Sequence, residues 1–248
     1  MDVVDLREFY QSQLGQTARR LIGHRMRQRW TTVAGATVLG LGYATPYLDA
    51  WRDEARRILA FMPARQGVAH WPAGASGLTA LVDEAELPLA DGSVDFALVV
   101  HGLELSEQIP DMLREIWRVL APQGRALIIV PNRRGMWARF DRTPFGHGRP
   151  FSRQQLTQML RDQQFQPAGW AHALFVPPVP RAFLMRSAPA WERLGLWASP
   201  GFSGVFMVEA VKQVYAAVPG KRVRRTVAAK PGMVPVPALR RTPAASPR

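Results

Sequence analysis

Short apolar segments alternate with amphipathic segments between residues 4 and 130 of this 248-residue chain, and this alternation constrains its fold most strongly. The apolar segments are typical of buried strands, and the amphipathic ones are typical of helices. We expect strands at residues 36–41, 58–62, 78–82, 94–100 and 125–130, and helices at residues 4–30, 47–59 and 109–120. Strands that alternate with helices form βαβ units with parallel strands. The sequence therefore predicts an α/β fold with a doubly wound, mainly parallel sheet and an N-terminal helix.

The rest of the chain completes the sheet and divides the molecule into parts. Residues 152–161 are typical of a helix capped by Ser152, and residues 170–176 and 205–211 of two further strands, which makes seven strands in all. We expect an N-terminal helical segment at 1–33, an α/β domain at 34–213 and a basic, flexible tail at 214–248, where no apolar period is visible.

The composition excludes several classes of site. The chain has no cysteine, which excludes disulfides and thiolate metal ligands, and its five histidines show no metal-ligand spacing. No apolar run reaches the roughly 18 to 20 residues of a membrane-spanning helix. The first ten residues lack the basic-then-apolar layout of a secretory signal. We therefore expect a cytoplasmic protein without a metal or a membrane span.

Positive charge is distributed unevenly along the chain. The formal net charge is +13, arginines cluster within 19–29 and 133–153, and no acidic residue follows Glu209. Such clusters favour a polyanionic partner such as RNA, or an acidic protein surface. Solvated surface charge with a disordered tail explains the same composition and stays open as an alternative.

A glycine-containing loop, Gly40 to Pro46, follows the first predicted strand. In a doubly wound sheet, ligands bind beyond the carboxyl ends of the strands, where glycines let the backbone approach them closely. A tight strand-to-helix turn would need the same glycines. The loop alone therefore does not distinguish a ligand site from a turn.

The block from Asp83 to Asn132 is more specific. Residues 83–120 read DEAELPLADGSVDFALVVHGLELSEQIPDMLREIWRVL, and APQGRALIIVPN follows. In this order, the acidic pair, the Asp-Gly turn, the His-x-Leu-Glu segment and the Arg-Val-Leu helix resemble the class I S-adenosylmethionine-dependent methyltransferases of the type-11-like group. The resemblance implies a Rossmann-like fold and S-adenosylmethionine as cofactor.

The resemblance also assigns site residues. It places the cofactor against Gly40, Gly42, Tyr43, Thr45, Met62, Gln66, Asp83, Glu84, His101 and Leu103. Asp83 would accept the adenine amino group, and Glu84 would offer its backbone amide to the ring. Methyl transfer needs positioning more than acid–base help, but His101 or His147 would accept a proton from the acceptor if either lies within reach. A structural role for His101 stays open.

Two departures from the family pattern bear on cofactor binding. Gly40 stands where the family usually has an acidic residue near the cofactor's ammonium group, and Met62 stands at the acidic ribose-binding position. Methionine cannot replace a carboxylate as an acceptor of ribose hydrogen bonds. Gln66 is the substitute that we expect for this contact.

The arginine clusters lead us to expect a macromolecular acceptor, RNA or protein. Trp137 and Phe145 would stack on a base while nearby arginines hold phosphates. Tyr10, Ser12 and Gly15 would contribute to a lid over the cofactor, and the Met- and Trp-rich segment 182–197 or an exposed strand edge would receive a small activator protein. A small-molecule methyltransferase, and a degenerate fold that serves only as a binding module, stay open as alternatives.

Overall fold

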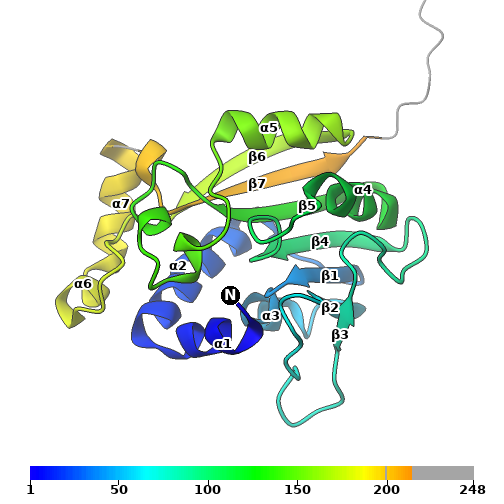
Figure 1. Ribbon diagram of the computed structural model, residues 1–248, viewed down its shortest axis with the longest axis horizontal. Helices are drawn as coiled ribbons and strands as arrows, with labels where there is room; N and C mark the ends of the chain where they lie inside the picture. Colours follow the sequence, from blue (N-terminus) through cyan, green and yellow to red (C-terminus); the bar gives the residue numbers. More distant parts are fainter. Residues whose placement is uncertain (199, 214–248) are drawn as a thin grey trace, which may run out of the picture. The chain divides into compact units, whose positions relative to one another are not determined.

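A computed structural model describes residues 1–198 and 200–213 and contains one seven-stranded sheet with the order β3-β2-β1-β4-β5-β7-β6 (Figure 1). The predicted tail at 214–248 lies outside the described residues. Strands β1 to β5 are parallel, and β7 pairs antiparallel with both β5 and β6. The predicted doubly wound, mainly parallel sheet is thus confirmed.

The strands lie close to their predicted positions, apart from β5 and β6, which begin at Leu120 and Phe165, before their predicted starts at 125 and 170. Their bounds are β1 Thr37–Gly42, β2 Arg57–Pro63, β3 Thr79–Val82, β4 Val94–Val100, β5 Leu120–Pro131, β6 Phe165–Ala173 and β7 Val205–Lys212. Apolar side chains on the central strands β1, β4 and β5 are buried on both sides of the sheet. This two-sided burial explains the nearly continuous apolar runs in the sequence.

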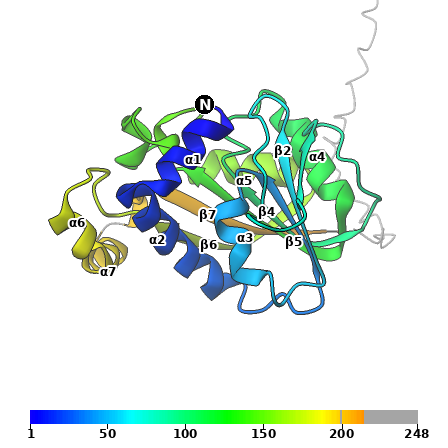
Figure 2. The ribbon, with the colours of Figure 1, turned by 90° about the horizontal axis from the view of Figure 1, so that it is seen from below.

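Helices cover both faces of the sheet. Helices α1 (Val3–Gln11), α2 (Gln13–Arg29) and α3 (Thr45–Leu48) pack on one face, together with part of α6 (Ala182–Arg186) and α7 (Ala188–Ala198) (Figure 2). Helices α4 (Ile109–Val119) and α5 (Arg153–Asp162) cover the other face. Short 3-10 turns occupy Asp49–Trp51, Trp137–Arg139, Pro144–Gly146 and Pro200–Phe202.

Two predicted helices differ from the structure. The helix expected at 4–30 is interrupted at Ser12, whose side chain caps α2 by accepting from the Gly15 amide at 3.0 Å. The helix expected at 47–59 ends near Trp51, because Trp51 is buried against Trp30 and the chain then pairs with β1 from Arg57 onward. Tertiary packing therefore overrides an amphipathic pattern here.

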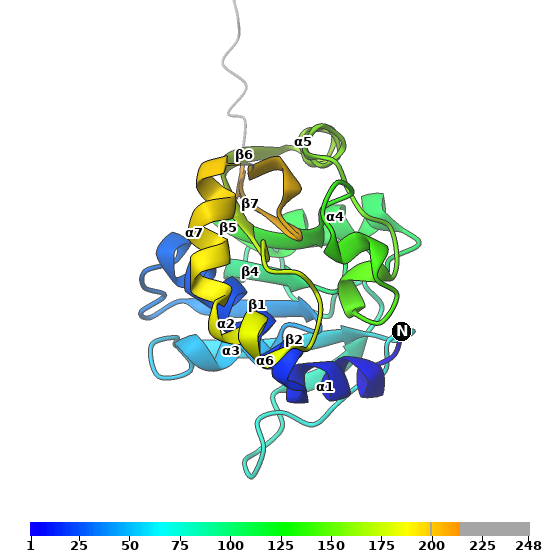
Figure 3. The same ribbon diagram turned by 90° about the vertical axis from the view of Figure 1, so that its left-hand side faces the viewer.

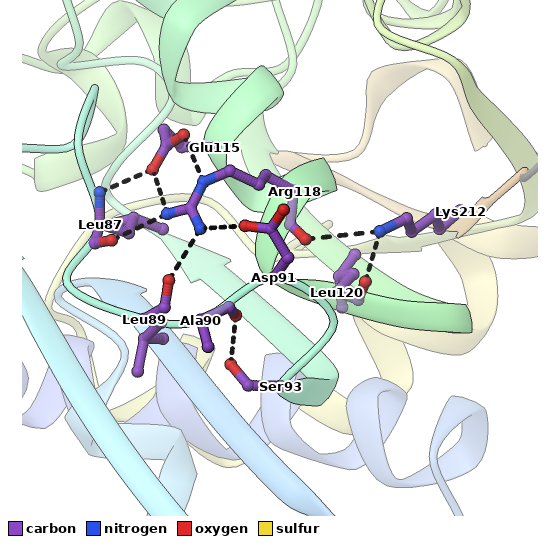
Figure 4. A network of polar contacts seen from close by, with 9 residues as sticks. All are labelled: Leu87, Leu89, Ala90, Asp91, Ser93, Glu115, Arg118, Leu120 and Lys212. Carbon is purple, nitrogen blue, oxygen red and sulfur yellow. Dashed lines mark hydrogen bonds and ion pairs between the residues drawn. The ribbon is translucent and has the colours of Figure 1, made fainter.

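Arg118, from the Arg-Val-Leu part of the sequence block, holds the loop between β3 and β4 in place (Figure 4). Its guanidinium donates to the carbonyls of Leu87 and Leu89 at 2.9 and 2.8 Å and pairs with Glu115 and Asp91. Glu115 in turn accepts from the Leu87 amide at 2.8 Å. These residues of the family block therefore have a structural role, since they fix the path of the chain between two strands.

Candidate active site

The carboxyl ends of β2, β3 and β4 surround a small cavity of about 150 Å³. Gln66 and Arg65 from the loop after β2, Glu84 from the loop after β3, and His101 after β4 line this cavity, and Met1 covers it. The start of α1 is attached here, because the Val3 amide donates to the Gln66 carbonyl at 2.7 Å. Arg65 and Glu107 form an ion pair at the surface nearby. The residues that precede α1 therefore border the cavity.

A chain of buried hydrogen bonds runs beside this cavity. Glu104 Oε1 lies 3.1 Å from His101 Nδ1, and the Tyr10 hydroxyl lies 2.8 Å from His101 Nε2. The Tyr47 hydroxyl lies 3.0 Å from that of Tyr10. All four side chains are at most 7% exposed. The chain therefore joins α1, α3 and the end of β4 in one polar network inside the core.

The direction of these hydrogen bonds follows from their partners. Burial raises the pKa of the Tyr10 hydroxyl well above its ordinary value, and burial likewise raises the pKa of Tyr47, so both hydroxyls keep their protons at physiological pH. With Glu104 as a carboxylate, His101 Nδ1–H donates to it, and Nε2 accepts from Tyr10. His101 thus presents a basic nitrogen that a carboxylate orients, which is the arrangement of a general base.

Two buried acceptors in this region lack a partner among the described residues. Gln66 donates from Nε2 to the His101 carbonyl at 2.8 Å, while its Oε1 is buried without a partner. Glu104 Oε2 is buried without one as well. Buried polar atoms are nearly always hydrogen-bonded in native proteins, so these two acceptors are exceptions among the described residues.

A second hollow of about 660 Å³ lies between α1, residues 140–147 and residues 178–180. Asp5, Glu8 and Phe9 of α1 line one side, and Phe140, Asp141, Arg142, Pro144 and Pro178–Pro180 contribute to the rest, so carboxylates outnumber the guanidinium group. We call it the acidic groove. Figure 3 shows α1 and the segment leading into α6 on the same side of the molecule.

Three aromatic side chains stand between the acidic groove and His101. Phe9 packs edge-on against Tyr10 and Phe145, with ring centroids 5.2 and 6.1 Å apart, and Phe145 lies 4.9 Å from the His101 ring. This aromatic wall, Phe9, Tyr10 and Phe145, separates the groove from the basic nitrogen. Two of its three members belong to α1, and the third, Phe145, lies against the His101 ring.

The glycine loop, Gly40 to Pro46, adjoins the polar network, since its Tyr43 stacks on Tyr10. Gly42 has φ +83°, and a β-carbon there would collide with the Val100 carbonyl and lie 2.9 Å from the Gly102 nitrogen. At Gly40, a β-carbon would lie 2.7 Å from Leu48 Cδ1 and 2.9 Å from Ala44 Cβ. Gly40, which stands where the family usually has an acidic residue, therefore has no space for a side chain in this arrangement.

The structure brings some of the predicted residues together and separates others. Gln66, Glu84 and His101 line the cavity. Tyr43 stacks on Tyr10 at 5.8 Å, and Thr45 begins α3. The remaining predicted residues lie elsewhere: Met62 and Leu103 are in the core, Asp83 is exposed with Oδ1 accepting from the Ala85 amide at 2.9 Å, and His147 lines the acidic groove.

The stacking role predicted for Trp137 and Phe145 is wrong. Both rings are at most 2% exposed, and Trp137 donates to the Val176 carbonyl at 2.8 Å. Trp137 is held by the segment after β6, and Phe145 packs against Trp137, Phe9 and His101. Tyr47 and Glu104 were not predicted as members of the polar network around His101, since nothing in their local sequence indicates those contacts.

The segment predicted to dock a partner forms α6 and α7 and exposes large apolar side chains. Phe183 is 75% and Trp197 is 85% exposed, and Trp191 and Leu194 lie on the same outer face of α7. Its one acidic residue, Glu192, is buried and accepts from the Phe175 amide at 2.7 Å. The exposed charges of this segment are therefore positive.

Residues 1–198 and 200–213 contain neither a membrane-spanning helix nor a metal-binding cluster. No helix in this part is long and apolar enough to cross a membrane. No group of three His, Asp or Glu side chains in the same part is arranged to hold a metal ion.

Comparison with known proteins connects this geometry to a family. Residues 29–128 match the family described as "Methyltransferase domain". A comparison with curated protein sequences found no significant match.

Solved structures with the same fold are numerous and distant in sequence. A Thermotoga maritima S-adenosylmethionine-dependent methyltransferase, described as a possible histamine N-methyltransferase, is 14% identical with a TM-score of 0.59, covering 85% of this chain and 96% of that one. The [4+2]-cyclase SpnF is 23% identical with a TM-score of 0.54, covering 81% and 83%. A Haloferax volcanii putative methyltransferase, solved with the Trm112 methyltransferase activator, is 18% identical with a TM-score of 0.55, covering 77% and 88%.

Proposed function

We propose that this chain, which belongs to the class I S-adenosylmethionine-dependent methyltransferases, methylates an acceptor that reaches His101 through the acidic groove. The observation that carries the proposal is the buried chain Glu104–His101–Tyr10, which lies between the cavity at the strand ends and the groove. It supplies an oriented basic nitrogen where family members bind their cofactor and acceptor.

The residues at the cavity fit the adenosine part of the cofactor. Gln66 and Glu84 both line the cavity, and the unpartnered Gln66 Oε1 would accept from a ribose hydroxyl, as expected from the sequence, once its side chain turns toward the cavity. Binding pockets for ligands of this size usually enclose about 300 Å³ or more, whereas this cavity holds about 150 Å³. The cavity therefore accommodates part of the cofactor in the present arrangement.

The space for the methionine part is filled by Tyr10, which stacks on Tyr43 above the glycine loop. Because Tyr10 belongs to α1, we propose that α1 moves outward when the cofactor binds and that Tyr10 leaves this space. The lid role expected for the N-terminal segment is thereby assigned to one side chain, Tyr10, which blocks the site.

When bound, S-adenosylmethionine supplies a methyl group on a positively charged sulfur. The residues of the chain then position the acceptor, and His101 Nε2 accepts a proton from it at the place now held by the Tyr10 hydroxyl. Glu104 keeps the imidazole in the orientation and tautomer that this transfer needs. The Asp5 and Glu8 carboxylates favour an acceptor with a positive or hydrogen-bond-donating group.

Calorimetry with S-adenosylmethionine and S-adenosylhomocysteine tests cofactor binding and the role of Tyr10. We expect Tyr10→Ala to bind more tightly than the wild type by about tenfold, because binding no longer requires displacement of a buried aromatic ring. Tyr10→Phe is the matched control, since it keeps the ring in place and should bind like the wild type. Gln66→Ala should bind up to about tenfold more weakly through loss of a hydrogen bond.

Two outcomes of this experiment would contradict the proposal. If neither ligand produces heat with the wild type or with Tyr10→Ala, the chain does not bind the cofactor, and the degenerate fold that serves only as a binding module would be favoured. Because Glu84 lines the cavity and Asp83 is exposed, we expect Glu84→Ala to weaken binding more than Asp83→Ala. The opposite order would assign the adenine contact to Asp83 and show that this loop rearranges on binding.

The acceptor and partner belong to the proposal as well. We infer from the arginine clusters that the acceptor is a macromolecule, RNA or protein, and from the exposed face of α6 and α7 that a small activator protein covers Phe183 and Trp197. The neighbour solved with an activator supports this inference by analogy. The [4+2]-cyclase SpnF has a similar fold, so this fold also supports reactions other than methyl transfer.

Light scattering on protein purified from its native source tests the activator. We expect a complex larger than the 27.7 kDa chain, and its dissociation when Trp197 is replaced by serine. The matched control is Val68→Ser, which removes an exposed apolar side chain, 46% exposed, from another part of the surface. A monomer at the mass of the chain would contradict the activator.

A further inference from the structure

Five arginines from three separate segments converge on the outer edge of the sheet. Arg25 and Arg29 come from α2, Arg133 and Arg134 follow β5, and Arg153 begins α5. They line two hollows of about 360 and 530 Å³ that share one residue, His172 of the edge strand β6. Figure 3 shows β6 at the outer edge of the sheet, between α7 and α5. We call these five arginines and His172 the arginine shelf.

The positive charge of the shelf is largely uncompensated. Among the described residues that line the two hollows there is no aspartate or glutamate. The ion pairs formed within residues 1–198 and 200–213 include Arg29, which pairs with Glu209 at 3.9 Å, but not Arg25, Arg133, Arg134 or Arg153. Four guanidinium groups are therefore available to an anion.

His172 shows that these charges act on a common point. Its pKa is lowered by burial and then by the positive charges of Arg153 and Arg25, which approach it from α5 and α2. Its Nδ1 lies 3.1 Å from the Ser203 hydroxyl, and the Phe206 ring packs edge-on against it. The arginines therefore disfavour the protonated form of His172, and an anion placed between the hollows would offset this effect.

Aromatic rings accompany the arginines. Trp170 lines the smaller hollow, and the Arg153 guanidinium lies 4.8 Å from the centre of its ring. Arg29 donates to the Trp170 carbonyl at 2.6 Å, so the backbone below is held in place. Guanidinium groups beside aromatic rings are what proteins use to bind the phosphates and bases of single-stranded nucleic acids.

We propose that the arginine shelf binds the phosphodiester backbone of a single-stranded nucleic acid and that the methyl acceptor belongs to this strand. The choice of a strand over a lipid surface rests on shape, since the cations line hollows that a flexible chain can enter and a flat bilayer cannot. The second half of the proposal rests on the proposed methyltransferase function, whereas binding to the shelf does not depend on it.

Fluorescence anisotropy with a labelled single-stranded RNA tests binding in the full-length chain. We expect Arg133→Gln with Arg134→Gln to weaken binding by about tenfold or more, because each phosphate loses a charge-assisted partner. The slope of log K against log salt should fall by about 1.4, at about 0.7 for each contact. A DNA strand of the same sequence shows whether the 2′-hydroxyl contributes.

The control removes the same charge from elsewhere in the chain. Arg57 and Arg161 are exposed at the start of β2 and the end of α5, and replacing both by glutamine should change binding less than about twofold. Equal losses in the two double variants would mean that only net charge matters, and the shelf would be rejected. No loss in either would assign RNA binding to a part outside the shelf and reject it as well.

The histidine gives a second readout that a folding defect would not imitate. In an NMR titration, the resonance that disappears in His172→Gln should show a pKa below the ordinary value of histidine, and this pKa should rise when RNA is added. Binding should accordingly strengthen as pH falls through this range. A pKa unchanged by RNA, or a shelf variant that loses binding to phosphatidylglycerol vesicles rather than to RNA, would overturn the proposal.

Discussion

Replacement of His101 by asparagine is expected to lower the rate of methyl transfer by about 10²- to 10⁴-fold while S-adenosylmethionine still binds. The loss follows from removal of the basic nitrogen that the Glu104 carboxylate orients and that Tyr10 now covers. Asparagine suits this position because His101 has φ +49°, a left-handed conformation that asparagine tolerates better than most residues. The measurement is single-turnover transfer of a labelled methyl group to fractionated RNA or protein.

Glu104→Gln sharpens this test because it keeps the shape of the side chain. A glutamine amide that donates to Nδ1 would shift the imidazole proton to Nε2, and the nitrogen facing the acceptor could then no longer accept a proton. We expect the rate to fall as in His101→Asn. Cofactor affinity should stay within about twofold, because the hydrogen bonds of Gln66 with the His101 carbonyl and the Val3 amide do not involve Glu104. If His147→Asn lowers activity and neither His101→Asn nor Glu104→Gln does, the general base would be His147 in the acidic groove and not His101.

The strand pattern and the family block were predictable because both depend on residues close together in the sequence. The apolar runs of β1, β4 and β5 follow from burial on two sides, and the Arg118 network lies within one stretch of about thirty residues. The break at Ser12 carried a local signal too, since serine is a preferred helix cap. The end of the helix near Trp51 carried none, because the contact with Trp30 decides it.

The sequence predicted individual residues of the candidate site but not the contacts between them. His101 and Glu84 follow from the family block, and Gln66 from its place after the second strand, but Tyr10 reaches His101 across 91 positions of the chain. The burial of Trp137 and Phe145 depends likewise on contacts with distant segments. The arginine shelf assembles clusters that the sequence displays separately, and its central residue, His172, has no distinguishing neighbours in the sequence.

Replacement of Gly42 by alanine is the second change with a large expected effect, and here stability is measured. Gly42 has φ +83°, where an alanine is strained by about 1–2 kcal/mol. Its β-carbon would also collide with the Val100 carbonyl, and forcing atoms into a packed core costs about 1–3 kcal/mol more. We therefore expect the free energy of unfolding to fall by about 2–5 kcal/mol, measured by urea denaturation.

Gly35→Ala separates the two contributions. Gly35 has φ +71°, close to that of Gly42, and no atom lies within 4 Å of the β-carbon it would gain. Its loss of stability should therefore be only the conformational part, about 1–2 kcal/mol. Equal losses in the two variants would show that the loop under the polar network moves aside easily. A larger loss at Gly42 would show that the loop after β1 and the end of β4 hold each other rigidly, which is the support that His101 needs to keep its nitrogen in place.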